Sequence, residues 1–107
     1  MFDHKRKTIN ENINTEGFEF ANSKEAVGKE GLVCWGYLMF KSTYGEGVAL
    51  VCNDKHFYRL PQRYVKIFKE ADDADLDFIM SGQPVSFRIL NTEKGDTVVP
   101  SINGMDI

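Results

Sequence analysis

The chain has 107 residues, of which 42% are apolar, 12% aromatic and 27% charged, and its formal net charge is −3. This length predicts one domain with a single core, and the composition excludes wholesale disorder, collagen-like repeats and coiled coil. No apolar run is long enough to span a membrane, no apolar segment follows the basic N-terminus as in a secretory signal, and two cysteines are too few for a disulfide framework. We therefore expect a cytoplasmic protein with no membrane association.

Residues 1–30 are predicted to form an N-terminal arm. Residues 1–16 are polar and Asn-rich with no clear period, whereas the alternating sequence GFEFA at 17–21 predicts a short strand. Residues 23–27 are expected to make one helical turn that stops at Gly28.

The main domain is expected to span residues 31–107 and to begin with three strands. The run LVCWGYLMFK at 32–41 is rich in aromatic and branched residues and predicts a strand that is bent or bulged at Gly36. Strands at 47–52 and 55–60 follow, separated by short turn sequences. Three strands joined in this way are typical of an antiparallel meander.

A helical segment is predicted near residues 62–81. Pro61 suits a first helical turn, and an apolar stripe continues to Ala71. Asp72 or Asp73 is expected to cap a second turn or two, which Gly82 ends.

Two further strands are predicted after the helical segment. Val85, Phe87 and Ile89 alternate with polar residues, which predicts a half-buried strand, and residues 91–96 have the composition of a hairpin loop. Residues 97–107 are expected to form the last strand, at an edge of the sheet.

The order of three strands, a helix and two strands is that of the OB-fold. The segments GLVCWGYLMFKSTYGEGVALV, YRLPQRYVKIF and PVSFRIL carry a resemblance to OB-fold single-stranded nucleic-acid-binding proteins of bacteriophages and mobile elements. We therefore expect a mainly β fold, a small five-stranded antiparallel OB-like barrel with one helical segment between its third and fourth strands. The resemblance implies single-stranded DNA binding with little sequence preference, as in phage or mobile-element replication and recombination.

Aromatic side chains and cations are the groups that such binding requires. Strict alternation along 32–41 places Trp35, Tyr37, Met39 and Lys41 on one face and Leu32, Cys34, Leu38 and Phe40 on a core face. Trp35 and Tyr37 then either stack on bases or pack beneath the arm or the helix. Tyr44 directly precedes Gly45 in the turn sequence STYGEG, a predicted binding loop, where it either stacks on a base or covers its own hairpin.

The charges of residues 55–77 are segregated. Residues 55–69 contain five basic and no acidic side chains, whereas residues 70–77 contain five acidic and no basic ones. This pattern predicts a basic surface of Lys41, Lys55, Arg59 and Arg88, away from the acidic segment. The predicted nucleic-acid-binding residues are Trp35, Tyr37, Lys41, Tyr44, Lys55, Tyr58, Arg59, Arg88 and Lys94.

Other kinds of site find little support in the sequence. The glycines at 45 and 47 lack the third glycine of a dinucleotide motif, and residues 73–84 lack the glycine and the glutamate of a calcium loop. Cys52 and His56 have no further metal-ligating partners, and no nucleophile motif is present. We expect no enzymatic activity, cofactor or metal.

Two functions remain open on sequence grounds. The first is single-stranded nucleic-acid binding, with DNA favoured, by stacking and phosphate contacts. The second is a protein–protein interaction module, such as a phage inhibitor or an assembly factor, that uses the same aromatic face. We also expect a homodimer or a higher homo-oligomer, because residues 97–107 would present an edge strand.

Overall fold

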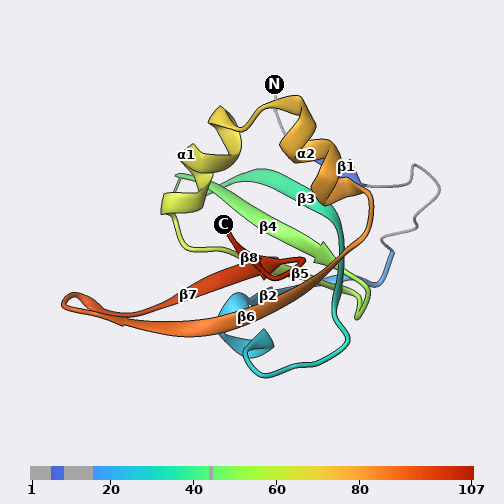
Figure 1. Cartoon of the computed structure of the whole chain (residues 1–107). Helices are drawn as coiled ribbons and strands as arrows, with labels where there is room; N and C mark the ends of the chain where they lie inside the picture. The colour runs from blue at the N-terminus through green and yellow to red at the C-terminus, as the bar shows by residue number, and fades with distance from the viewer. Residues whose placement is uncertain (1–5, 9–15, 44) are drawn as a thin grey trace.

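The structure is a computed structural model that describes residues 6–8, 16–43 and 45–107. Its elements, in chain order, are β1 (Arg6–Thr8), β2 (Glu19–Asn22), the 3₁₀ turn η1 (Ser23–Ala26), β3 (Val33–Ser42), β4 (Gly45–Cys52), β5 (His56–Arg59), α1 (Arg63–Glu70), α2 (Asp73–Met80), β6 (Gln83–Thr92), β7 (Gly95–Ile102) and β8 (Met105–Asp106) (Figure 1). No helix of this described part is long and apolar enough to cross a membrane.

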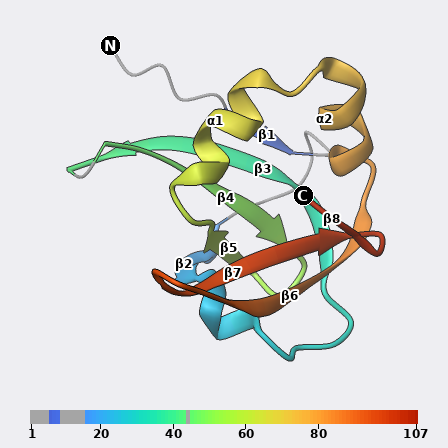
Figure 2. The same cartoon turned by 60° about the vertical axis from the view of Figure 1, so that its left-hand side comes forward.

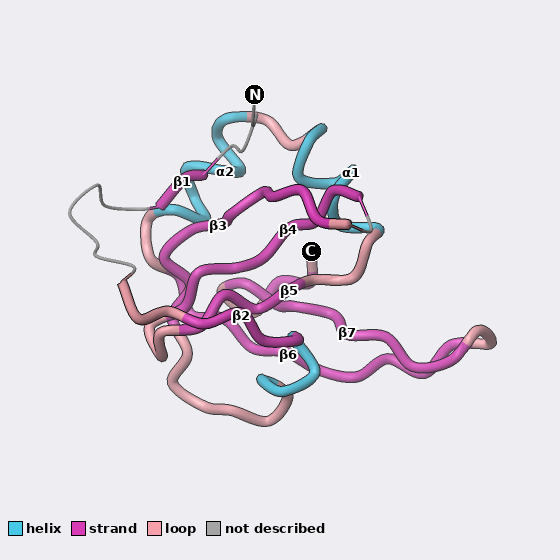
Figure 3. The backbone as a smooth tube through the Cα atoms, turned by 180° about the vertical axis from the view of Figure 1, so that it is seen from behind, coloured by secondary structure: helices cyan, strands magenta, loops and turns pink. Residues whose placement is uncertain are grey.

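The strands form one open mixed sheet in the order β2-β5-β4-β3-β6-β7-β8, and β1 pairs with β3 outside this path. The prediction of a closed five-stranded antiparallel barrel is therefore wrong. Closure would require pairing between β5 and β7, but β2 runs parallel along the outer edge of β5 (Figure 3). The part of the chain that the structure describes is a mixed α/β fold with an open sheet and two α-helices.

Residues 19–26 belong to the sheet and the core. Phe20 of β2 lies in register with Phe57 of β5, and the Asn22 side chain caps η1 by accepting a hydrogen bond from the Lys24 N–H at 2.9 Å. Ala26 of η1 is fully buried in the main core. The short strand and the helical turn predicted in this region are both present; the strand begins two residues and ends one residue later than expected, and the turn ends one residue earlier.

The predicted helical segment consists of two helices, and the second is longer than the turn or two expected after Ala71. Ala71 is extended, with φ −63° and ψ 143°, so α1 ends at Glu70. Asp72 is extended as well, and its side chain accepts a hydrogen bond from the Asp75 N–H at 2.9 Å, which caps α2. Both helices lie on the same side of β3 and β4 (Figure 2).

A β-bulge in β3 decides which side chains face the helices. The pairing of β3 with β4 shifts register between Cys34 and Gly36. Cys34, Tyr37 and Met39 all belong to the main core beneath the helices. In a regular strand, Cys34 and Tyr37 would point to opposite faces, because they are an odd number of residues apart. Leu38 and Phe40 lie on the opposite face. The predicted faces of 37–41 were therefore exchanged, because one extra residue reverses the alternation.

The predicted last strand is in fact a strand and a tight hairpin. Asn103 and Gly104 have φ values of 52° and 82°, which turn the chain back so that β8 pairs with the end of β7. The hairpin of β6 and β7 extends beyond the core (Figure 1), so alternating burial stops after Phe87 and Ile89 is exposed. Because β8 pairs only with Ser101 and Ile102, most of β7 still presents an edge with which a second chain could pair. Homo-oligomer formation therefore stays a prediction.

Candidate nucleic-acid interface

Four phenylalanines gather on the sheet face opposite the helices. The ring of Phe20 lies 5.0 Å from that of Phe57 and 5.3 Å from that of Phe40, and Phe18 lies 5.4 Å from Phe57. Phe57 is buried beneath the others, whereas Phe20 is 52% exposed. We call Phe18, Phe20, Phe40 and Phe57 the aromatic face. Exposed rings on a sheet offer π-faces to planar ligands.

Arg59 extends the aromatic face with a cation. Its guanidinium lies 5.2 Å from the centre of the Phe40 ring, and alternation along β5 places Arg59 on the same side as Phe57. The Phe40 ring packs against Gly47, its cross-strand neighbour: a Cβ at position 47 would lie 2.5 Å from the ring. The absence of a side chain at Gly47 thus leaves the space that the Phe40 ring occupies.

A polar cleft of about 330 Å³ opens beside Arg59. It lies where the ends of β2 and β5 approach the start of β7. In a closed barrel, pairing between β5 and β7 would occupy this place. Its lining consists of Asn22, Ser23, Lys24, Arg59, Leu60, Pro61, Asp96, Thr97 and Val98. Arg59 therefore belongs to both the aromatic face and a cleft with a second cation, Lys24.

Two of the predicted stacking residues are buried. Tyr37 is 2% exposed and packs against Phe68 of α1, with ring centres 5.3 Å apart. Tyr58 is 1% exposed; its hydroxyl donates a hydrogen bond to Asp54 and accepts one from Lys29 Nζ at 2.9 Å. Neither ring has an open face on which a base could stack. Trp35 is half-buried at the bulge, and Tyr44 lies outside the described residues.

The predicted basic surface is not assembled. Arg88 is paired with Asp106, and β6 is separated from β5 by β4 and β3. Alternation places Lys41 on the helix side, opposite Glu46 of β4. Glu46 also accepts a hydrogen bond from Lys69, which is the main reason that the pKa of Glu46 is lowered. Lys55 lies in the turn before β5 with φ 66°, and Lys94 lies at the tip of the β6–β7 hairpin. Of the four cations predicted to form this surface, Arg59 is the one that joins the aromatic face.

The residues that sequence reasoning missed are Phe18, Phe20 and Phe40. The signal for the first two was the alternation of GFEFA, which places both phenylalanines on one face of a strand. Phe40 was assigned to the core because the register shift at the bulge was not applied to the residues after it.

Comparison with family models, with curated proteins and with solved structures found no match to this chain. Within residues 6–8, 16–43 and 45–107, no group of three or more His, Cys, Asp or Glu side chains is placed to hold a metal ion. The function is therefore inferred from the geometry of the aromatic face and the polar cleft.

Proposed function

We propose that the aromatic face binds single-stranded nucleic acid, with DNA favoured, by base stacking and phosphate contacts. The observation that supports this most directly is the arrangement of the half-exposed Phe20 against Phe40, with the Arg59 guanidinium above Phe40. Stacking tolerates any base, so this surface predicts binding with little sequence preference.

The polar cleft supplies the second requirement of the proposal. Arg59 and Lys24 both line it, next to the rings on which the bases would stack. A backbone phosphate in the cleft would be held by these two cations while a base lies on the exposed ring of Phe20, which Phe40 supports from the side. Asp96 also lines the cleft, and its carboxylate would disfavour a phosphate placed close to it.

The position of the acidic residues is compatible with an anionic ligand. Residues 70–77 belong to the end of α1, the turn after it and α2, which cover the opposite side of the sheet. The core of the domain thus lies between these carboxylates and the aromatic face. Separation weakens the repulsion that a net charge of −3 would otherwise exert on phosphates.

The test is the binding of fluorescein-labelled oligo-dT, followed by anisotropy at about 20 mM salt, where phosphate contacts are strongest. Phe20→Ala should weaken binding by about 1–3 kcal/mol, the usual contribution of one stacked base. Phe78→Ala is the matched control, because Phe78 is a partly exposed phenylalanine on α2, across the sheet.

Arg59→Ala tests the cation. It should weaken binding and reduce the dependence of log affinity on log salt by roughly 0.7, the value for one phosphate contact on a single strand. Arg88→Ala, which removes a cation that is already paired with Asp106, should leave both quantities unchanged.

Two results would overturn the proposal. One is the failure of the wild-type protein to bind oligo-dT or oligo-U at low salt. The other is an equal loss of affinity in Phe20→Ala and Phe78→Ala. Either result would favour the alternative, in which the aromatic face contacts another protein.

A further inference from the structure

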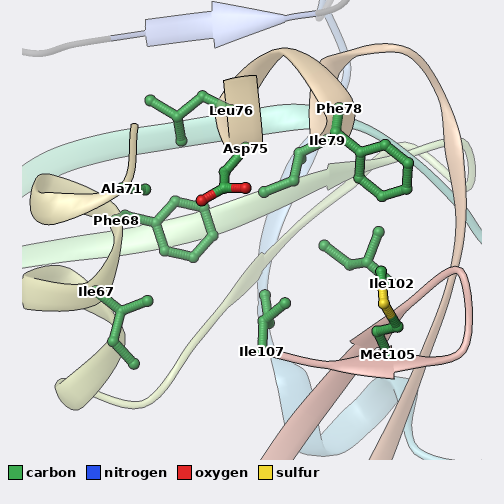
Figure 4. A pocket seen from close by; sticks show the side chains of 10 residues that line it. All are labelled: Ile67, Phe68, Ala71, Asp75, Leu76, Phe78, Ile79, Ile102, Met105 and Ile107. Carbon is green, nitrogen blue, oxygen red and sulfur yellow. The ribbon is translucent and has the colours of Figure 1, made fainter. Parts of the chain in front are cut away.

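An apolar groove opens on the helix side of the sheet, between α1, α2 and the β7–β8 hairpin. Its volume is about 320 Å³. Figure 4 shows side chains from both helices and from the C-terminal residues converging on it. The lining consists of Ile67, Phe68, Ala71, Asp75, Leu76, Phe78, Ile79, Ile102, Met105 and Ile107.

Large apolar side chains stand exposed at the mouth of the groove. Met105 of β8 is 60% exposed, Ile67 of α1 46% and Phe78 of α2 38%. They come from three different elements and surround one cavity, so their exposure is contiguous rather than scattered. Contiguous apolar exposure of this kind marks a docking surface, and an unbranched methionine adapts readily to the shape of a bound partner.

The surroundings of the groove are acidic. Among the described residues that line the groove, Asp75 is the one with a charged side chain, and it projects toward Phe68 in Figure 4. α2 carries Asp73 and Asp77 in addition to Asp75 and has no basic residue, and Glu70 and Asp72 stand at the junction of the two helices. On α1, Lys69 is held by Glu46 at 2.5 Å, and Arg63 donates hydrogen bonds to Thr97 and Val98. These two cations are thus engaged away from the groove, and the third cation of α1, Lys66, is not among the described residues that line it.

We propose that this groove binds a cationic amphipathic helix of a partner protein. Apolar residues on one face of that helix would enter the cavity between Ile67, Phe78 and Met105. Lysine or arginine residues flanking that face would lie beside Asp75 and the other carboxylates of α2. Helices of this kind bind to apolar grooves through anchors spaced one turn apart, and charge complementarity selects a basic partner over an acidic one.

The probes are two labelled amphipathic model peptides with the same pattern of leucines, one with lysine and one with glutamate at the polar positions. Anisotropy should show binding of the Leu/Lys peptide, and little or none of the Leu/Glu peptide. Met105→Ala and Phe78→Ala should each weaken the Leu/Lys peptide by about tenfold, as expected when an apolar anchor is lost at an interface. Ile89→Ala, on the exposed part of β6, should have no effect.

A second pair of variants separates a local charge effect from attraction to an acidic protein in general. Asp75→Asn and Asp96→Asn change the net charge equally, but only Asp75 lines the groove. Asp75→Asn should weaken binding of the Leu/Lys peptide about threefold, the scale of an exposed ion pair, and Asp96→Asn should not. Thermal unfolding followed by circular dichroism checks that each variant is folded. Met105→Ala is the variant least expected to lower stability, because the Met105 side chain is highly exposed.

Three results would overturn this inference: binding of both peptides alike, equal weakening by Asp75→Asn and Asp96→Asn, or no binding of the Leu/Lys peptide. A concentration-dependent dimer in sedimentation that Met105→Glu abolishes would also overturn it, because a second copy of the chain would then cover the groove. Oligo-dT binding is measured independently on the opposite face, so failure here leaves the proposed function standing.

Discussion

Asp54 is the centre of a polar cluster at the turn between β4 and β5. Its carboxylate accepts hydrogen bonds from the Tyr58 hydroxyl and from Lys29 Nζ, the latter at 3.3 Å, while its Oδ1 is buried and has no hydrogen-bond partner among the residues that the structure describes. Burial acts to raise the pKa of Asp54, but the hydrogen bonds from Tyr58 and Lys29 outweigh it, so this pKa lies below its usual value.

We expect this cluster to make stability depend on pH. Because the pKa of Asp54 is lower in the folded than in the unfolded chain, its ionised form stabilises the fold above the unfolded value, and this stabilisation is lost as pH falls through the folded pKa. Asp54→Asn should lower the free energy of unfolding in urea by about 1–2 kcal/mol at pH 7. Its deficit relative to wild type should shrink at acid pH, roughly from pH 5 downward.

The matched control is Asp96→Asn, at an exposed carboxylate of the β6–β7 hairpin. Glu46 and Asp106 also have lowered pKa values, but both residues are present in the two variants and in wild type. The difference in free energy of unfolding between Asp54→Asn and wild type, followed against pH, therefore reports on Asp54. A constant deficit for Asp54→Asn across this pH range would contradict the proposed linkage.

The two cysteines are expected to be unreactive in the folded protein. Cys34 and Cys52 lie opposite each other on β3 and β4, both buried as free thiols. Burial raises the pKa of Cys34 to about 12 and also raises that of Cys52, so neither is a thiolate near neutral pH. A thiol reagent such as DTNB should react slowly at pH 8 and rapidly after urea is added. Rapid reaction without urea would show that the core around β3 and β4 opens readily.

At the scale of elements, the bulge in β3 determines what each face does. It sends Tyr37 under α1 and Phe40 to the aromatic face, so two aromatic residues of one strand have different roles. We expect the core residue to contribute mainly to stability and the outer residue to the proposed recognition. This division can be measured with substitutions on the two faces.

Tyr37→Ala and Phe20→Ala should therefore differ in stability. Removing the buried Tyr37 ring leaves a cavity against Phe68 and should lower the free energy of unfolding by about 3–5 kcal/mol. Removing the half-exposed Phe20 ring should cost roughly 1 kcal/mol, the scale of an exposed aromatic contact. Urea unfolding gives both values. Similar losses for both variants would contradict the assignment of faces.

The hairpin from β7 to β8 depends on its glycine. Gly104 has φ 82°, where a Cβ is unfavourable, and nothing lies within 4 Å of a Cβ placed there. Gly104→Ala should therefore destabilise through backbone strain alone, by about 1–2 kcal/mol in urea unfolding. Asn103→Gly is the control, because Asn103 also has positive φ, and glycine there should be within about 0.5 kcal/mol of wild type. A neutral Gly104→Ala would indicate a different turn.

On the scale of the whole molecule, the sheet separates two surfaces of different chemistry. The aromatic face carries Arg59, while the helix side carries the apolar groove and the carboxylates of 70–77. A compact domain can thus present one surface to an anionic ligand and another to a cationic one. The two proposed ligands would have no shared contact residues.

This arrangement predicts that substitutions act on one ligand at a time. Phe20→Ala should weaken oligo-dT and leave the Leu/Lys peptide unaffected, whereas Met105→Glu should weaken the peptide and leave oligo-dT unaffected. The slope of log affinity for oligo-dT against log salt should be only about −1.4, since the cleft offers two cations, Arg59 and Lys24. A much steeper slope would place further cations in the interface. Loss of both ligands in either variant would contradict the separation.

Several elements of this protein follow from local sequence. The alternation of GFEFA, the apolar run at 32–41 and the stripe after Pro61 correspond to β2, β3 and α1, because period and turn chemistry act between near neighbours in the chain. The second helix was foreseen as an extra turn or two capped by aspartate, and Asp72 caps it. The Asn103-Gly104 turn was also present in the sequence as an Asn-Gly hairpin signal, although residues 97–107 were predicted to form a single last strand.

The tertiary structure alone decided how these elements assemble. Pairing of β2 with β5 joins residues far apart in the chain and prevents closure of the barrel, and no local pattern specifies such a partner. The bulge between Cys34 and Gly36 reverses the direction of every side chain that follows it in β3. Tyr37 therefore lies in the main core and Phe40 on the opposite face, the reverse of what regular alternation predicts. A binding face depends on register across strands, and register is set by long-range pairing rather than by the period of any one strand.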